Sequence, residues 1–416
     1  MPTDRTVPTD RTAAPPGIFT PAFFQDAHPV FDTLRERAPA TLVTGVSGTR
    51  LWLIPRYEEA RALLSSPSVR KGDWKRPDLL REQHLTRSER RREMNTRIRA
   101  HMVAGDHPDH QRLRQGTQQA LGRHRIEALR PRIELFADET LGALAALRGA
   151  GPVEFRAKVA YPFSVAVVAE LLGLRAEEQA GFPAWFDALM CRRGSDSARK
   201  ASLILSGFTE RLADRRRAHP ARGLLSTLGS RPDGRRPLTR QELASTAFLL
   251  LIAGIETANA VANGVFTLLS HPEQYATLRA DRSLLPGAVE ECLRHDGPFR
   301  AVGPRYTVAR VDLGEGVSIP AGEFLLIAVA AANRDPRRFP DPHRFDITRA
   351  DHAHLALGFG SRRCAGAALA RVQMEILLGR LLDRFPGLRP GVPVEEVRRR
   401  PSMTMNWLQD LPVLLR

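Results

Sequence analysis

A ten-residue stretch with three glycines and one cysteine constrains this chain more than any other segment. Residues 357–366 read Leu-Gly-Phe-Gly-Ser-Arg-Arg-Cys-Ala-Gly and lead into a run, 365–385, whose apolar residues recur at helical spacing. The glycines permit backbone torsions and close approaches that a Cβ would block. Neighbouring arginines and free N–H groups at the start of a helix favour Cys364 as a thiolate. A thiolate is a suitable axial ligand for haem iron, whereas an isolated cysteine is more often an inert buried residue.

The spacing of the glycines and arginines around Cys364 favours the role of an axial ligand over that of an inert buried residue. The stretch resembles the haem-binding loop of cytochromes P450, whose pattern is Phe-Gly-x-Gly-x-(Arg/His)-x-Cys-x-Gly. The matching positions are Gly358, Gly360, Arg362, Cys364 and Gly366. The stretch departs from the pattern at Leu357, where the family usually has a phenylalanine that packs near the ligating sulfur. We therefore expect ligation by the thiolate, with altered electronics.

Two polar residues lie in the middle of an apolar run. Thr239 and Glu242 form a capping box that begins a helix predicted to extend to about residue 270. Within it, Glu256 and Thr257 interrupt the apolar sequence, and burying them without partners would cost about 1–3 kcal/mol each. Either Thr257 bonds back to the carbonyl four residues earlier and bends the helix, or a widened turn holds polar groups and water over a ligand.

The same segment resembles the oxygen-binding motif of cytochromes P450, (Ala/Gly)-Gly-x-(Asp/Glu)-Thr, without departure. The matching residues are Ala253, Gly254, Glu256 and Thr257. The resemblance implies that Ala253 and Gly254 lie against the haem. It also implies that Glu256 and Thr257 relay protons to dioxygen.

Three further cations match residues that bind haem carboxylates in that family. Residues 106–114 read Asp-His-Pro-Asp-His-Gln-Arg-Leu-Arg, and a proline with acidic neighbours predicts the start of a helix. His110 and Arg114 are four residues apart and share a helical face, a spacing that surface pairs also have. The segment resembles Asp-Pro-Pro-x-His-x-x-x-Arg, whose histidine and arginine bind one haem propionate. Arg305 matches the arginine that binds the second.

A Glu-x-x-Arg pair is predicted to have a structural role. Glu291 and Arg294 lie one helical turn apart, a favourable ion-pair spacing that also occurs by chance. The pair resembles the Glu-x-x-Arg motif of the same family, and its third member is expected to be Arg344. The resemblance implies that these three residues brace the core and take no part in the reaction.

The resemblance covers about residues 21–416 and implies a single cytochrome P450 domain. Its fold would be mainly α with a small β region, a triangular helical prism that encloses the haem. Residues 1–20 carry a proline-rich repeat that cannot bury a core, so we expect a disordered tail.

Residues 72–100 are rich in arginine, as a solvated face would be, and 176–205 match the mobile substrate lid of the family. The local patterns predict a β-hairpin at 41–55 and helices at 30–38, 58–64, 125–147 and 159–174.

The bulk properties are those of a soluble cytoplasmic protein. With 43% apolar and 26% charged residues the chain can bury a sizeable core. No apolar run approaches a membrane span, and the polar N-terminus does not read as a secretory signal. Three dispersed cysteines argue against a disulfide framework and lack zinc-type spacing.

The formal charge of +16 comes almost entirely from arginine. It is explained by a GC-rich genome that places arginine on solvated surfaces, or by a basic face for an acidic redox partner. Nucleic-acid binding is disfavoured because no such motif is present.

These observations predict a haem-thiolate monooxygenase of the soluble bacterial, actinobacterial P450 type. Haem b with Cys364 as axial ligand would be the cofactor. Dioxygen and a small organic compound, by resemblance a natural product, would be the substrates. Electrons must come from a separate ferredoxin or flavodoxin and its reductase, because no flavin or NAD fingerprint is present. We expect that partner to dock near Arg362 and Arg363.

Two alternatives remain open at this point. One keeps the fold but changes the reaction to carbon–carbon or carbon–nitrogen coupling, or to a peroxide-driven oxidation. The other is a non-catalytic haem protein that binds a gas or ligand. The intact Glu256–Thr257 pair disfavours the second alternative.

Overall fold

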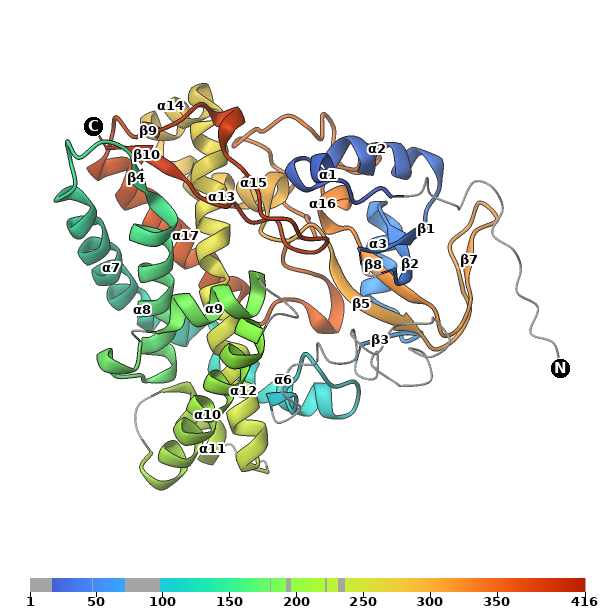
Figure 1. Cartoon of the computed structure of the whole chain (residues 1–416), viewed down its shortest axis with the longest axis horizontal. Helices are drawn as coiled ribbons and strands as arrows, with labels where there is room; N and C mark the ends of the chain where they lie inside the picture. The colour runs from blue at the N-terminus through green and yellow to red at the C-terminus, as the bar shows by residue number, and fades with distance from the viewer. Residues whose placement is uncertain are drawn as a thin grey trace.

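The structure is a computed structural model, and it describes residues 17–416 except 47, 72–97, 180, 192–195, 221–222, 231–235 and 416. Almost all of the predicted tail and of the arginine-rich segment 72–100 therefore lies outside the described residues. Helices make up one side of the molecule, and a small sheet covered by α1, α2 and α3 makes up the other (Figure 1). The predicted mainly α architecture with a small β region is confirmed.

The helix that contains Glu256 runs through the centre of the helical side as two segments (Figure 1). Helix α12 (Arg240–Ile255) begins with the predicted capping box, and α13 (Thr257–Leu269) continues after a break at Glu256. The predicted helical run to about residue 270 is thus confirmed, with a single-residue turn at Glu256. The combined run, 240–269, is apolar and long enough to cross a membrane, but 78% of its most apolar window is buried inside the protein. It is therefore the core helix of a globular fold.

The other predicted helices are found within a few residues of their expected bounds. They are α2 (His28–Arg37), α3 (Tyr57–Ser65), α7 (Arg123–Ala145), α8 (Tyr161–Leu172) and α17 (Ala367–Arg384). A π-helical turn, η2 (Arg156–Ala160), leads into α8. The remaining α-helices of the described residues are α1 (Pro21–Gln25), α6 (Asp109–Ala120), α9 (Phe182–Cys191), α10 (Asp196–Ala218), α11 (Leu224–Ser230), α14 (Pro272–Ala280), α15 (Leu285–Asp296) and α16 (Val329–Ala332).

Helices α8, α10, α15 and α17 surround the central helix, which consists of α12 and α13. Helix α12 packs mainly against α10 and α8, whereas α13 packs against α15 and α17. Helix α9 lies on α10, in the segment where the sequence predicts a substrate lid. The described part of that segment is helical despite its weak periodicity, because α9 buries Phe182, Phe186 and Leu189 in the main core.

The largest sheet has five strands in the order β1-β2-β8-β5-β3. Its strands are β1 (Thr41–Thr44), β2 (Arg50–Ile54), β3 (Val69–Arg70), β5 (Val302–Thr307) and β8 (Phe324–Ile327). The predicted hairpin at 41–55 is the antiparallel pair β1–β2. Strand β5 pairs with β3 and β8, and this places Arg305 in the interior of the sheet.

Two smaller sheets complete the β region. One has the order β4-β10-β9 and comprises β4 (Val153–Glu154), β9 (Arg389–Pro390) and β10 (Pro412–Leu414). The other is the hairpin of β6 (Val311–Asp312) and β7 (Ser318–Ile319). Because β10 pairs with β4, which directly precedes η2, the C-terminal segment is held beside the start of α8.

Candidate active site and cofactor cradle

The cysteine loop is a compact turn that only glycine permits at one position. Gly360 has a positive φ of 69°, and a Cβ there would lie 3.1 Å from Ser65 Cβ at the end of α3. The Cys364 N–H donates to the Leu357 carbonyl at 2.8 Å and closes the loop. Helix α17 begins at Ala367, three residues after Cys364. The loop therefore presents the cysteine just before the helix N-terminus, as the sequence predicts.

The Cys364 thiol is desolvated by the surrounding protein although the residue as a whole is exposed. The residue has accessible surface, yet burial raises the pKa of the thiol. The groups that act in the opposite direction are the Gly366 N–H and the guanidinium groups of Arg114, Arg371 and Arg363. The sequence therefore predicts the groups that lower the pKa of the thiol, but not the net shift, which is upward because the effect of burial is larger than theirs. A coordinating metal ion deprotonates a thiol outright, so this burial is compatible with ligation.

Arg305 is a buried cation with an unsatisfied donor. It is 6% exposed, and its Nε has no hydrogen-bond partner in the described part of the chain. Burial, and then the charge of Arg362, lower the pKa of Arg305 to about 10. A buried donor without an acceptor costs about 1–3 kcal/mol. Such a group is ready to bind an anionic ligand.

Helix α6 brings a histidine and an arginine to the cysteine loop. The His110 Nδ1 lies 2.7 Å from the Met102 carbonyl, and its Nε2 lies 3.2 Å from the Ser361 carbonyl. Burial lowers the pKa of His110. Arg114 donates to the carbonyl of Arg363 at 2.5 Å. Both residues thus adjoin the loop directly, and the spacing is not that of a mere surface pair.

Arg362 points into the protein rather than to its surface. Its guanidinium group pairs with Asp106 and donates to the Gly105 carbonyl at 2.7 Å. Its side chain is bound on the inner side of the loop and is only 12% exposed, so Arg362 itself offers little surface to a redox partner, and docking near this loop stays a prediction. The positive charge of Arg362 also acts on Arg305, where it contributes to the lowered pKa.

The residues present fit a thiolate-bound group that carries carboxylates. The structure gathers His110, Arg114, Arg362 and Cys364 by direct contacts, and Arg305 joins them through its interaction with Arg362. Arg305 keeps a buried donor free for an acceptor. A Cβ added at Gly366 would meet nothing within 4 Å. Cations, a free donor and open space beside the thiol are what such a cofactor requires.

A single-residue turn at Glu256 separates α12 from α13. The Glu256 N–H donates to the carbonyls of Gly254 and Ile252, and the Asn259 N–H donates to the Glu256 carbonyl at 3.0 Å. The Thr257 side chain is 8% exposed and makes no hydrogen bond to any described residue, so the back-bonding interpretation is not supported. Gly254 itself lies against α8, where a Cβ would come within 2.4 Å of Val168.

Trp407 is a contributor to this turn that the sequence analysis missed. Its indole Nε1–H donates to Glu256 Oε1 at 2.5 Å. The only signal in the sequence is that a buried tryptophan usually finds an acceptor for its N–H group. Nothing in the sequence indicates which acceptor, because the two residues are 151 positions apart.

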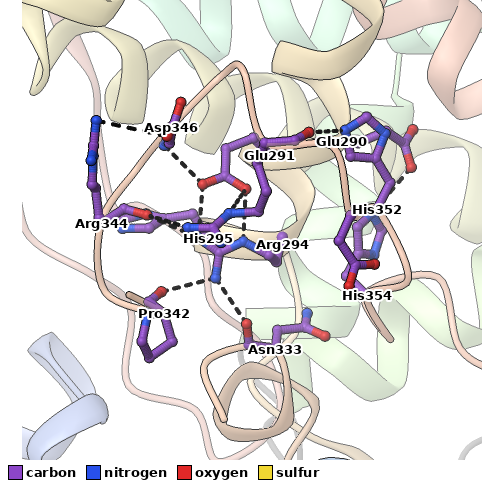
Figure 2. A network of polar contacts seen from close by, with 12 residues as sticks. Glu290, Glu291, Arg294, His295, Asn333, Pro342, Arg344, Asp346, His352 and His354 are labelled. Carbon is purple, nitrogen blue, oxygen red and sulfur yellow. Dashed lines mark hydrogen bonds and ion pairs between the residues drawn. The ribbon is translucent and has the colours of Figure 1, made fainter. Parts of the chain in front are cut away.

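The predicted brace exists, but one of its members is different. Glu291 and Arg294 form a bidentate pair with two contacts of 2.7 Å and are each 1% exposed (Figure 2). Arg344 joins only through its carbonyl, which accepts from Arg294 at 3.1 Å. Its guanidinium group is 65% exposed and lies 3.7 Å from Asp346. The third member is instead Arg349, whose Nε lies 3.4 Å from Glu291 Oε2. The expected role of the Arg344 side chain is therefore wrong.

Glu290, which precedes Glu291 on α15, connects this helix to α17, the helix that follows Cys364. Figure 2 shows Glu290 on the side of His354, away from the Glu291–Arg294 pair. Glu290 accepts from Arg371 of α17 at 2.5 and 2.8 Å and lies 3.2 Å from His354. Burial alone would raise the pKa of Glu290, but these hydrogen bonds lower it to about 2. The contact fixes Arg371, which also acts on Cys364.

A hollow of about 370 Å³ opens beside the cysteine loop. Phe359 forms part of its wall and carries the Arg61 guanidinium 4.7 Å above its ring. Its lining includes four arginines: Arg61, Arg338, Arg363 and Arg371. Glu58 also lines the hollow, and Arg338 and Arg371 are paired with Asp351 and Glu290, so Arg61 and Arg363 carry most of the positive charge of this face. Arg363 is its exposed member from the loop.

Comparison with known proteins is consistent with this geometry. A family model described as Cytochrome P450 matches residues 182–407. Cytochrome P450 107B1 from Saccharopolyspora erythraea is 39% identical over 396 residues, which cover 95% of this chain and 96% of that protein. Cytochrome P450 monooxygenase PikC from Streptomyces venezuelae is 39% identical over 409 residues, covering 97% and 95%. The solved structure of tirandamycin C-bound P450 monooxygenase TamI superimposes with a TM-score of 0.86 at 37% identity, covering 95% of this chain and 99% of that one.

Proposed function

The chain belongs to the cytochrome P450 family and is a monooxygenase of that family, and from this premise we propose that it oxidises a small natural product. Dioxygen would be the oxidant, and a ferredoxin or flavodoxin with its reductase would supply the electrons. The named relatives support this proposal, since one structure among them holds tirandamycin C. The proposed unit is the single domain of residues 21–416, acting in the cytoplasm.

The family implies haem iron with a thiolate ligand, and we propose haem b with Cys364 as that ligand. His110, Arg114 and Arg362 on one side and Arg305 on the other would hold its carboxylates. Ala253 and Gly254 would lie against its face. When bound, haem supplies the iron at which dioxygen is activated. The unsatisfied Nε of Arg305 is the observation that carries this assignment.

Glu256 and Thr257 would deliver protons to the oxygen substrate. Both residues lie at the junction of α12 and α13, and the Thr257 hydroxyl has no competing partner among the described residues. A hydroxyl group beside a carboxylate can pass a proton and recover it from the acid. Replacement of Thr257 by alanine should uncouple oxygen consumption from product formation, and unchanged coupling would exclude the relay.

The absorption spectrum of dithionite-reduced protein under carbon monoxide tests the proposal. A Soret band at the position that names the family identifies thiolate ligation, and Cys364→Ser should abolish it. A band at the position of a histidine- or thiol-ligated haem would contradict the role of Cys364. Mass spectrometry of products separates hydroxylation, which adds one oxygen atom, from coupling, which adds none.

A ferredoxin would dock on the basic face around the hollow lined by Arg61, Arg338, Arg363 and Arg371. These arginines surround the outer side of the cysteine loop, and their charges would steer an acidic protein to it. Turnover with a ferredoxin should therefore slow as ionic strength rises. Turnover that is insensitive to salt would exclude this docking mode.

A further inference from the structure

Glu256 is held by an aromatic side chain from the far end of the sequence. The Trp407 Nε1–H donates to Glu256 Oε1 at 2.5 Å. Trp407 is 2% exposed, and its ring packs on Phe186 of α9 with 5.6 Å between the ring centroids. A hydrogen bond from a rigid, buried donor to a carboxylate fixes the direction of that carboxylate.

The second carboxylate oxygen faces another well-fixed group. Asn259, on the first turn of α13, places Nδ2 3.5 Å from Glu256 Oε2. The Asn259 Oδ1 accepts from Arg156 Nη2 at 3.2 Å. Arg156 is 3% exposed and also donates to the Gln409 carbonyl, two residues after Trp407. The C-terminal segment and η2 thus fix the surroundings of Glu256 from two sides.

This arrangement continues to α9. Arg156 donates to the Tyr161 hydroxyl at 2.9 Å, and that hydroxyl donates to Asp187 Oδ1 at 3.2 Å. Asp187 also accepts from Arg400 at 3.0 Å. The Arg400 N–H in turn donates to the Trp407 carbonyl at 2.9 Å. Both the backbone and the ring of Trp407 are therefore held in place, so its N–H has little freedom to turn away.

We propose that Trp407 is a positioning residue that orients the Glu256 carboxylate at the break between α12 and α13. The inference rests on the proposed role of Glu256 in proton delivery. Thr257 follows Glu256 directly, and its hydroxyl has no partner among the described residues. A carboxylate that rotated freely would spend less time aligned with that hydroxyl, and proton transfer requires hydrogen-bond geometry.

The direct test is Trp407→Phe, which removes the N–H and keeps an aromatic ring on Phe186. Haem-loaded protein is supplied with NADPH, spinach ferredoxin and its reductase, so that no organic substrate is needed. We expect NADPH oxidation to slow several-fold, and the ratio of its rates in H₂O and D₂O to rise, because proton delivery becomes more rate-limiting. An unchanged rate and an unchanged isotope ratio would overturn the proposal.

Trp52→Phe is the matched control. Trp52 is 5% exposed, and its Nε1 has no hydrogen-bond partner among the described residues. The variant loses the same atoms from a buried site without losing a hydrogen bond. We expect its rate and isotope ratio to equal those of the parent protein. Equal changes in both tryptophan variants would mean that loss of packing is responsible, and would overturn the proposal.

A double variant asks whether Trp407 acts through Glu256. If it does, Trp407→Phe added to Glu256→Gln should change the rate and the isotope ratio no further than Glu256→Gln alone. Additive losses would show that Trp407 acts on another group and would overturn the proposal.

A spectroscopic measurement separates failure of this inference from failure of the proposed function. Protein labelled with ¹⁵N-tryptophan is observed in its reduced, carbon-monoxide-bound form, which is diamagnetic. The indole resonance that Trp407→Phe removes should move upfield in Glu256→Gln, because its charged acceptor is lost. A resonance that does not move overturns the contact. A resonance that moves, with a Glu256→Gln variant that turns over normally, refutes the proton role of Glu256 and with it the positioning role.

Discussion

Two clusters of buried charge in this protein differ in how fully the chain supplies their partners. In the first, Glu291 and Arg294 are each 1% exposed, and the chain satisfies both through paired contacts and three backbone carbonyls. In the second, Arg305 is 6% exposed and keeps a donor without a partner in the described residues, close enough to Arg362 for the charge of Arg362 to act on it. A cluster that is complete serves stability, whereas an incomplete one reserves binding capacity for a ligand.

The largest expected effect comes from breaking the complete cluster. Glu291→Ala leaves Arg294 buried without its carboxylate, so we expect the free energy of unfolding to fall by about 3–5 kcal/mol. Urea denaturation measures this change. Arg344→Ala is the control, and it should change stability by less than about 0.5 kcal/mol, because its side chain is exposed and the carbonyl that Arg294 uses is retained. An equal loss of free energy of unfolding in both variants would show that the Arg344 side chain does belong to the brace.

The next effect is a loss of stability in acid that originates at Glu290. The folded-state pKa of Glu290 is about 2, compared with an ordinary value of 4.5. Its contribution, about 3 kcal/mol, is therefore fully present above pH 4.5 and is lost as the pH falls towards 2. The free energy of unfolding of Glu290→Gln should vary less with pH across this window than that of the parent. Asp138→Asn, which alters a half-exposed pair with Arg380, should leave the profile nearly unchanged.

The incomplete cluster should respond in the opposite sense. Arg305→Met removes a buried donor that has no partner, so the haem-free protein should be as stable as the parent or more stable. The loaded protein should release haem about 10- to 100-fold faster, because a charge-assisted hydrogen bond is lost. Haem transfer to apomyoglobin measures this rate.

Arg300→Met is the matched control for Arg305→Met. Arg300 is 2% exposed, and its guanidinium group donates to the carbonyls of Ser402, Met405 and Phe24. Its replacement should lower the free energy of unfolding and leave haem release unchanged. If Arg305→Met destabilises the haem-free protein as much as Arg300→Met does, then the two arginines serve the same structural purpose.

The smallest effect is expected at the surface. Arg363→Ala removes one exposed charge of the basic face, so association with a ferredoxin should weaken by about threefold and depend less steeply on salt. Replacement of Arg279, an exposed arginine of α14 that does not line the hollow, should not change association. Stopped-flow reduction at several ionic strengths measures both variants.

The sequence predicted features that depend on neighbouring residues along the chain. The glycines around Cys364 fix a turn before a helix, and the capping box fixes the start of α12, because both operate over a few residues. The position of Glu256 and Thr257 in an apolar run indicated a polar turn. The family motifs added His110, Arg114 and Arg305, whose roles as cofactor ligands stay predictions.

Only the tertiary structure decided the features that depend on distant segments. In the structure, Arg349 rather than the Arg344 side chain pairs with Glu291. Arg362 binds Asp106 on the inner side of the loop, and Trp407 donates a hydrogen bond to Glu256. The tertiary structure also reversed the expected pKa shift of Cys364, because burial is a property of the whole fold. Hydrogen bonds and desolvation depend on distances between atoms in space, and the order of residues along the chain does not specify those distances.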